Sequence, residues 1–164
     1  MKRYLATLVL ICLITGSFVT SYGSTHVYIQ DWDLVDSGKN LHYQNDSKYV
    51  SEITYAEETW NNYIDVISED TALTLCDVTI EDYNWAGTPK AGRTLQTHYI
   101  QFNDYYMKNY LSAKRKNVVT HEFGHALGLE HHSYQNNVMY GYVTTWSVLG
   151  SLDQGSYTAA YNNY

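Results

Sequence analysis

One short segment, from Thr120 to His132, constrains the fold of this chain more than any other. It places His121 and His125 four residues apart, and an α-helix stacks side chains at that spacing on one face. Two imidazoles one turn apart can share a single zinc ion, while Glu122 between them lies beside the metal without needing to bind it. The segment therefore predicts a helix that carries two ligands of one metal site.

Gly128 and His131 extend this predicted site beyond the helix. Glycine is the residue that most readily adopts the left-handed backbone that ends a helix. The chain can therefore fold back at Gly128 and bring His131 to the metal as a third ligand, which leaves an open fourth position for water. The full spacing, H-E-x-x-H-x-x-G-x-x-H, occurs by chance in about one in 10⁵ chains of this length. The alternative is a helix whose histidines merely lie on a polar face.

The pattern resembles the zinc-binding signature of the metzincin metalloendopeptidases. Downstream, Asn137-Val138-Met139-Tyr140 is similar to the Met-turn that lies beneath the metal in that group, and Met139 follows His131 by eight residues. The resemblance implies that the three histidines of the motif bind Zn²⁺ and that Glu122 is the catalytic residue. It also implies that Met139 packs under the metal site and does no chemistry.

The implied chemistry is hydrolysis of peptide bonds. Zinc lowers the pKa of its bound water towards 7 and polarises the scissile carbonyl. Glu122 would take the water's proton as general base and pass it to the leaving amine. The expected partner is a protein or peptide substrate, whose identity the sequence does not give. The alternative is a secreted binding protein that keeps the scaffold without turnover, but inactive relatives often lose the base and this chain keeps Glu122.

Two residues close to the motif have more than one possible role. Tyr142 follows the Met-turn, where matrixins form the wall of the substrate pocket beyond the cleaved bond. It could instead be an auxiliary zinc ligand or an oxyanion donor, as a tyrosine is in astacins. His132 directly follows His131 and is an alternative third ligand, although its spacing from the helix fits the motif less well.

The start of the chain has the layout of a secretory signal peptide. A short basic lead precedes an apolar run from Leu5 to Ile14, and the small residues Ser21 and Gly23 suit a cleavage site. Ten apolar residues are too few to span a bilayer comfortably, so an uncleaved membrane anchor is only the alternative. We therefore predict a signal peptide over residues 1–23, a catalytic domain over residues 24–164, and a secreted protein with no membrane contact after cleavage.

Charge and cysteine content exclude several classes of partner. Cleavage removes Lys2 and Arg3, which leaves eight basic residues against seventeen acidic ones and a formal charge of −9. Such a chain repels nucleic acid and anionic membranes, and we expect a monomer. Cys12 is lost with the signal, so Cys76 has no partner for an internal disulfide and is expected inside a strand as a small apolar residue.

Hydrophobic periodicity predicts the elements between these features. The helix before the motif should bury a stripe of apolar residues, namely Tyr49, Ile53, Ala56, Trp60 and Tyr63. Charged residues off that stripe and at the start of the motif helix are expected to be solvated, namely Glu52, Glu57, Glu58, Lys114, Arg115 and Lys116. The expected elements are a strand at 26–29, a loop at 33–45, helix 49–64, strand 72–81, loop 82–92, one or two strands in 93–103, helix 112–127 and helix 151–161.

This order of elements resembles the matrixin branch of the metzincins. The resemblance implies an α+β fold of the metzincin type, with a twisted and mostly parallel sheet backed by helices, the zinc helix and the Met-turn. The chain is also expected to depart from matrixins, since we expect no cysteine-bearing inhibitory segment before the domain. His98 stands alone where matrixins gather several histidines around a second zinc, and no acidic run has calcium-loop spacing.

Overall fold

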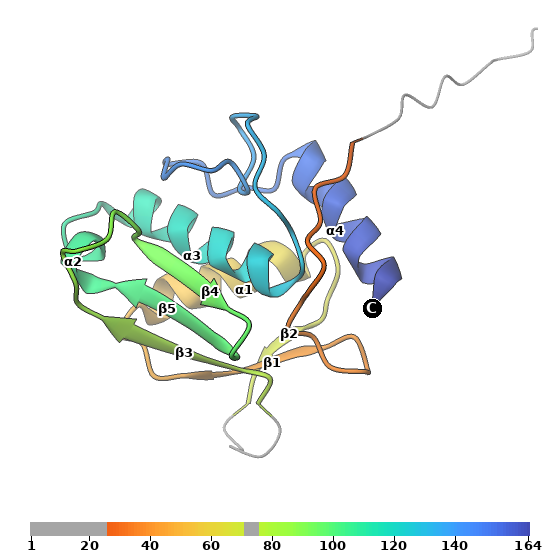
Figure 1. Cartoon of the computed structure of the whole chain (residues 1–164), viewed down its shortest axis with the longest axis horizontal. Helices are drawn as coiled ribbons and strands as arrows, with labels where there is room; N and C mark the ends of the chain where they lie inside the picture. Colours follow the sequence, from red (N-terminus) through yellow and green to blue (C-terminus); the bar gives the residue numbers. More distant parts are fainter. Residues whose placement is uncertain (1–25, 71–75) are drawn as a thin grey trace, which may run out of the picture.

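A single five-stranded sheet forms the base of the fold (Figure 1). The computed structural model describes residues 26–70 and 76–164, so the expected signal peptide lies outside the described residues. Only the last strand of the sheet runs antiparallel to its neighbour, which confirms the expected α+β fold with a mostly parallel sheet. In spatial order the strands are β2 (Ile67–Glu69), β1 (Leu41–Asn45), β3 (Val78–Tyr83), β5 (Tyr99–Asn103) and β4 (Gly92–Leu95).

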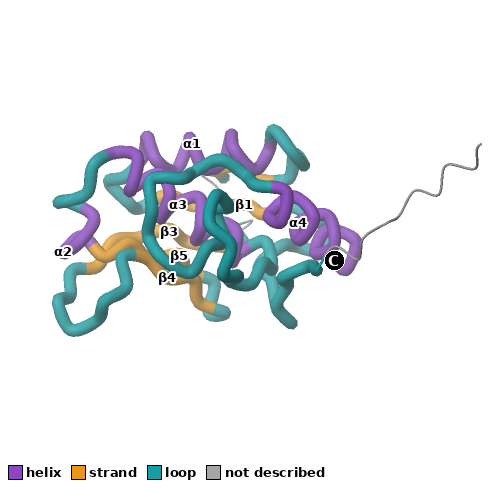
Figure 2. The backbone as a smooth tube through the Cα atoms, turned by 90° about the horizontal axis from the view of Figure 1, so that it is seen from above, coloured by secondary structure: helices purple, strands orange, loops and turns teal. Residues whose placement is uncertain are grey.

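Two long helices cover one face of this sheet, as Figure 2 shows. They are α1 (Val50–Asn61) and α3 (Ser112–Ala126), and a short helix, α2 (Asp104–Met107), connects β5 to α3. The last helix, α4 (Ser151–Asn163), packs beyond the sheet near the ends of α1 and α3. The expected helices are therefore confirmed. No helix of the described residues is long and apolar enough to cross a membrane.

The core lies between the sheet and the two long helices. Ile100 and Phe102 of β5 point into it as the alternation in the sequence predicts, and both are fully buried. Trp60 of α1 is also fully buried, and its indole N–H donates to the carbonyl oxygen of Thr120 at 2.9 Å. Burying a side chain of this size stabilises a fold by about 1.5–3 kcal/mol. This hydrogen bond also fixes α1 against the turn of α3 that begins the histidine motif.

Two predictions in the first part of the domain were wrong. The expected strand at 26–29 is only a single bridge between Ile29 and Leu129, because its partner is the turn after α3 and not the sheet. The expected loop at 33–45 ends before Leu41, where β1 begins. Leu41 and Tyr43 of β1 are buried, while the polar residues between and after them lie on the open face and hide the strand in the sequence.

Strand β3 begins later than the sequence predicts. It starts at Val78 and extends to Tyr83, and residues 72–75 of the expected strand lie outside the described residues. Cys76 is half-buried just before β3, and its thiol donates to the carbonyl oxygen of Val78 at 2.7 Å. The prediction that Cys76 lies within a strand was therefore wrong, although its thiol is free.

Two charged residues that were expected to be solvated form an ion pair instead. Glu52 of α1 is only 3% exposed, and the guanidinium Nε of Arg115 on α3 donates to its carboxylate at 2.7 Å. This contact lowers the pKa of Glu52 against the opposing effect of burial. The pair crosses from α1 to α3, so neither partner can be recognised from its own helix. Tyr63 lies past the end of α1 and is 40% exposed, which also differs from the expected stripe.

Candidate metal centre and active site

The three histidines of the motif meet at one point. His121 and His125 lie on α3, and His131 follows the turn after it. The Nε2 atom of His131 is 2.9 Å from that of His121 and 3.0 Å from that of His125. Each residue thus offers one nitrogen to a shared position, and the set could hold a metal ion.

The turn at Gly128 places His131. Gly128 has a φ of 80°, a left-handed conformation that strains other residues. The N–H of Leu129 donates to the carbonyl oxygen of Gly124 at 2.9 Å, which closes the end of the helix as the sequence predicts. Gln30 and Tyr28 then bond to Gly128 and Glu130 along the returning backbone. The N-terminal segment therefore holds the turn that brings the third histidine back.

Hydrogen bonds orient two of these rings. The carbonyl oxygen of Val138 lies 2.8 Å from Nδ1 of His121, and that of Leu129 lies 2.9 Å from Nδ1 of His125. A carbonyl oxygen can only accept, so each Nδ1 carries the proton and each Nε2 directs its lone pair at the shared position. Two such lone pairs converge with Nε2 of His131 at about 3 Å, and a cation between the three nitrogens could accept a lone pair from each. The donor set therefore fits a divalent metal.

Burial keeps the three imidazoles in the neutral form that metals bind. It lowers the pKa of His121 well below its usual value and that of His125 to about 4. The pKa of His131 is also lowered, again mainly by burial. Histidine binds metals only when neutral, so these shifts favour metal binding at neutral pH.

Glu122 lies beside the histidines and is only 6% exposed. Burial raises the pKa of its carboxyl group to about 7, although a hydrogen bond from Thr94 opposes this shift. The Oγ1 hydroxyl of Thr94 donates to Oε2 of Glu122 at 2.9 Å. A carboxyl group with a pKa near neutrality can both accept and release a proton under physiological conditions.

An open cleft of about 420 Å³ passes over this group of residues. One wall is β4 with the loop before it, and another is the segment from Tyr140 to Val143. Asn117 of α3 fixes the chain after that wall, since its side chain donates to the carbonyl oxygen of Trp146 at 2.6 Å and accepts the N–H of Thr144 at 2.8 Å. The three histidines and Glu122 thus lie in a cleft in which Asn117 holds the chain that follows one wall.

Tyr142 lies in the wall of this cleft, and 74% of its surface is exposed. Its ring lies 5.5 Å from that of Tyr140, measured between ring centroids. This position is consistent with Tyr142 as part of the wall of the substrate pocket, which is one of the roles that the sequence allows. The other role, as ligand or oxyanion donor, stays a prediction.

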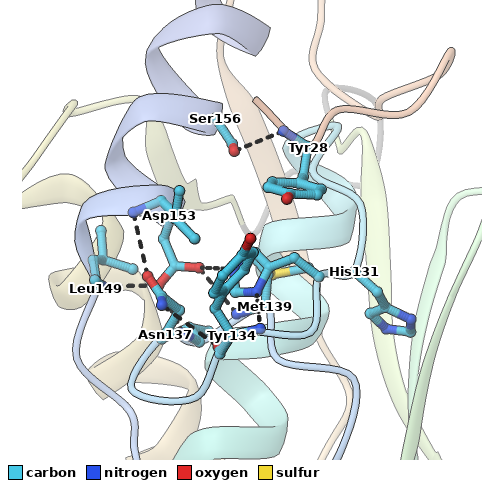
Figure 3. A network of polar contacts seen from close by, with 12 residues as sticks. Tyr28, His131, Tyr134, Asn137, Met139, Leu149, Asp153 and Ser156 are labelled. Carbon is cyan, nitrogen blue, oxygen red and sulfur yellow. Dashed lines mark hydrogen bonds and ion pairs between the residues drawn. The ribbon is translucent and has the colours of Figure 1, made fainter. Parts of the chain in front are cut away.

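The Met-turn is held by Asp153 of α4 (Figure 3). The carboxyl group of Asp153 is fully buried and accepts the backbone N–H groups of Val138 at 2.6 Å, Met139 at 3.0 Å and Gly150 at 2.8 Å. Met139 is 1% exposed and packs against Gly124, where an added Cβ would lie 2.3 Å from its sulfur. Asp153 cannot be recognised from the sequence as a partner of the turn, because no local pattern links it to Val138 and Met139.

His132 lies in a different place from the three histidines. It is 6% exposed, and its Nε2 lies 3.4 Å from a carboxyl oxygen of Asp153. Its Nδ1 accepts the N–H of Tyr134 at 3.3 Å, and its ring packs edge-on against Tyr28. In Figure 3 the imidazole of His131 points away from this network around Asp153. The geometry therefore favours His131 over His132 as the third metal-binding residue.

A second set of metal-type donors lies on the open face of the sheet. Asp36, His42 and Asp77 each place one ligand atom within 4.8 Å of the others. His42 is half-buried, with its Nδ1 2.9 Å from the hydroxyl of Ser68. His98 is exposed and is not part of either set of metal-type donors found among the described residues.

The fold and the site together define a metallopeptidase of the metzincin type. The histidine motif on α3, the Met-turn below it and the mostly parallel sheet are the features of that class. The sequence profile of the Matrixin family matches residues 36–154, and the chain belongs to this family. Matrixins depend on zinc, and the three histidines are the matching metal-type donors.

Solved structures give the same fold. A structure of myroilysin is similar with a TM-score of 0.59 at 15% identity, and the likeness covers 82% of this chain and 97% of that one. A crystal structure of myroilysin has a TM-score of 0.55 at 16% identity and covers 85% and 86%. At this identity the likeness shows the fold alone. No curated protein sequence matches the chain.

Proposed function

We propose that the protein is a secreted zinc metalloendopeptidase in which His121, His125 and His131 hold Zn²⁺ and Glu122 is the general base. The observation that carries this proposal is the convergence of three Nε2 atoms, with that of His131 within 3.0 Å of the other two, beside a buried carboxyl group and in an open cleft. Secretion rests on the signal-like residues 1–23 alone.

Different residues of the chain have separate roles in the proposed hydrolysis. When bound, Zn²⁺ supplies a Lewis acid that polarises the scissile carbonyl and acidifies water at its open position. Glu122 accepts a proton from the attacking water and then delivers it to the leaving amine. A pKa of about 7 suits a group that must take up and release a proton in one cycle. Met139 supports the floor of the site and transfers no proton.

The cleft favours a polypeptide substrate. Strand β4 lies at the edge of the sheet, so one of its sides forms no hydrogen bonds with another strand of that sheet. Its residues Gly92, Arg93 and Thr94 line the cleft. An extended peptide can add to such an edge through backbone hydrogen bonds. This arrangement would hold a scissile bond over the histidines without demanding one particular sequence.

Cleavage of a denatured protein such as casein tests this function directly. We expect cleavage by zinc-loaded protein, its loss on addition of a chelator and its return with added Zn²⁺. Mass-spectrometric mapping of cut sites in a diverse peptide library would then give the substrate preference. If folded, zinc-loaded protein cut no peptide in that library, the alternative of a binding protein on the same scaffold would replace the enzyme.

Substitution of His131 by alanine tests the third ligand. We expect His131→Ala to bind Zn²⁺ at least about 100-fold more weakly, because one of three protein ligands is lost. Competition with a chromogenic chelator measures this change. His98→Ala is the matched control, since His98 is exposed and belongs to neither set of metal-type donors. Unchanged affinity in His131→Ala would reject this ligand and direct attention to His132.

Acid should release the metal only below about pH 5. Burial lowers the pKa of His125 to about 4, so protons compete for this nitrogen at a lower pH than the usual value of about 6.5 suggests. For the same reason the unfolded metal-free chain binds more protons here between about pH 6.5 and 4, and the folded state loses stability as the pH falls through that range. Zinc released into a dye solution can be measured at each pH. A release midpoint above pH 6 would contradict the expectation.

A further inference from the structure

Two residues of β4 lie along the side chain of Glu122. Gly92 and Thr94 are two positions apart and therefore face the same side of the strand. The hydroxyl oxygen of Thr94 lies 2.9 Å from Oε2 of Glu122 and 2.8 Å from its backbone carbonyl oxygen. A Cβ added to Gly92 would lie 2.8 Å from both Cγ and Oε1 of Glu122, so β4 is in close contact with the whole side chain.

The two carboxyl oxygens of Glu122 have different surroundings. The single hydroxyl proton of Thr94 is shared between the backbone carbonyl oxygen of Glu122 and Oε2, so β4 is tied to both the backbone and one carboxyl oxygen of this residue. Oε1 makes none of the hydrogen bonds found among the described residues, and it faces Gly92, which has no side chain to cover it. A carboxyl group with one oxygen fixed and the other free has a defined orientation. Oε1 is thus the oxygen available to exchange a proton.

We propose that Thr94 is a positioning residue for Glu122, whose hydroxyl fixes Oε2 so that Oε1 meets the attacking water. This role rests on the proposed function of Glu122 as general base. It adds a requirement that the histidine motif does not contain, since Thr94 lies 28 residues before Glu122 on a different element. Gly92 has a complementary role, because any larger residue there would displace the Glu122 side chain.

Kinetics of two Thr94 variants test the proposal. Thr94→Val keeps the branched shape and removes the hydroxyl, and Thr94→Ser keeps the hydroxyl. We expect Thr94→Val to lower kcat by about 10- to 100-fold with little change in KM, as for the loss of one hydrogen bond to a charged group. Thr94→Ser should recover most of that loss. Zinc content should stay at the wild-type value in both variants, because neither change removes a ligand.

A second background separates positioning from a general effect on the structure. In Glu122→Gln, which has no base to position, Thr94→Val should lower the residual rate by less than about twofold. An equal loss in both backgrounds, full kcat in Thr94→Val, or failure of Thr94→Ser to recover activity would each overturn the proposal.

Crystal structures of the metal-free proteins give a readout that needs no turnover. Glu122 should occupy one orientation in the wild type and in Thr94→Ser, and more than one in Thr94→Val. An unchanged Glu122 in Thr94→Val would refute the positioning role. If instead the wild type cut no peptide, the proposed function would fail while these structures still decided what Thr94 does.

Discussion

Glu122→Gln is expected to lower kcat by at least about 10²- to 10⁴-fold while the protein keeps its zinc. Glutamine preserves the shape of the side chain but cannot accept the water's proton. The loss should fall at the upper end of this range or beyond it, because the same group also serves the leaving amine. Zinc content and melting temperature should stay near the wild-type values, since no metal ligand is removed.

The matched variant for this experiment is His125→Ala, which should lose both zinc and activity. The pair separates a group that moves protons from a group that holds the metal. Full turnover by Glu122→Gln would show that the proposed mechanism is wrong. Loss of zinc from Glu122→Gln would make Glu122 a ligand, which the metzincin arrangement of three histidines does not allow.

Asp153→Ala is expected to destabilise the folded protein by about 3–5 kcal/mol. Three backbone N–H groups, two of them in buried hydrogen bonds, would lose their acceptor, and each buried unsatisfied group costs about 1–3 kcal/mol. The sum is reduced because the turn can relax towards water. In a domain of this size the melting temperature should fall by about 8–15 °C. Thermal unfolding followed by circular dichroism measures this shift.

Gln154→Ala is the control for this variant, because Gln154 is the next residue of α4 and its side chain makes a weak contact, 3.5 Å from Nε2 to the carbonyl oxygen of Leu149. Its melting temperature should change by about 2 °C or less. Asp153→Ala should also bind zinc more weakly, since Val138 both bonds to Asp153 and orients the ring of His121. A melting temperature within about 2 °C of the wild type would show that the turn holds its shape without Asp153.

The histidine motif could be predicted because its geometry is local. Helix periodicity places His121 and His125 together, and Gly128 explains how His131 reaches them within a few residues. The same argument places Ile100 and Phe102 in the core, since alternation along a single strand is enough. In each case the interacting residues lie close together in the sequence or share one element.

Contacts between distant segments could not be predicted in this way. Thr94 and Asp153 are ordinary polar residues in the sequence, and each acquires its place only when β4 or α4 packs beside the motif. Glu52 and Arg115 lie on different helices, so each was assigned to solvent when its own helix was considered alone. Strand β1 was missed for a related reason, because the sheet that buries Leu41 is built from later strands.

Because the chain turns at Gly128, a bound metal would also have a structural role. His131 belongs to a stretch between α3 and α4 that contains no helix or strand among the described residues. An ion shared with His121 and His125 would cross-link this stretch to α3. Chelation should therefore loosen the chain after Gly128 first, and amide hydrogens there should exchange sooner than those of the sheet. Binding of zinc would then stabilise one wall of the cleft, and loss of zinc would make that wall more mobile.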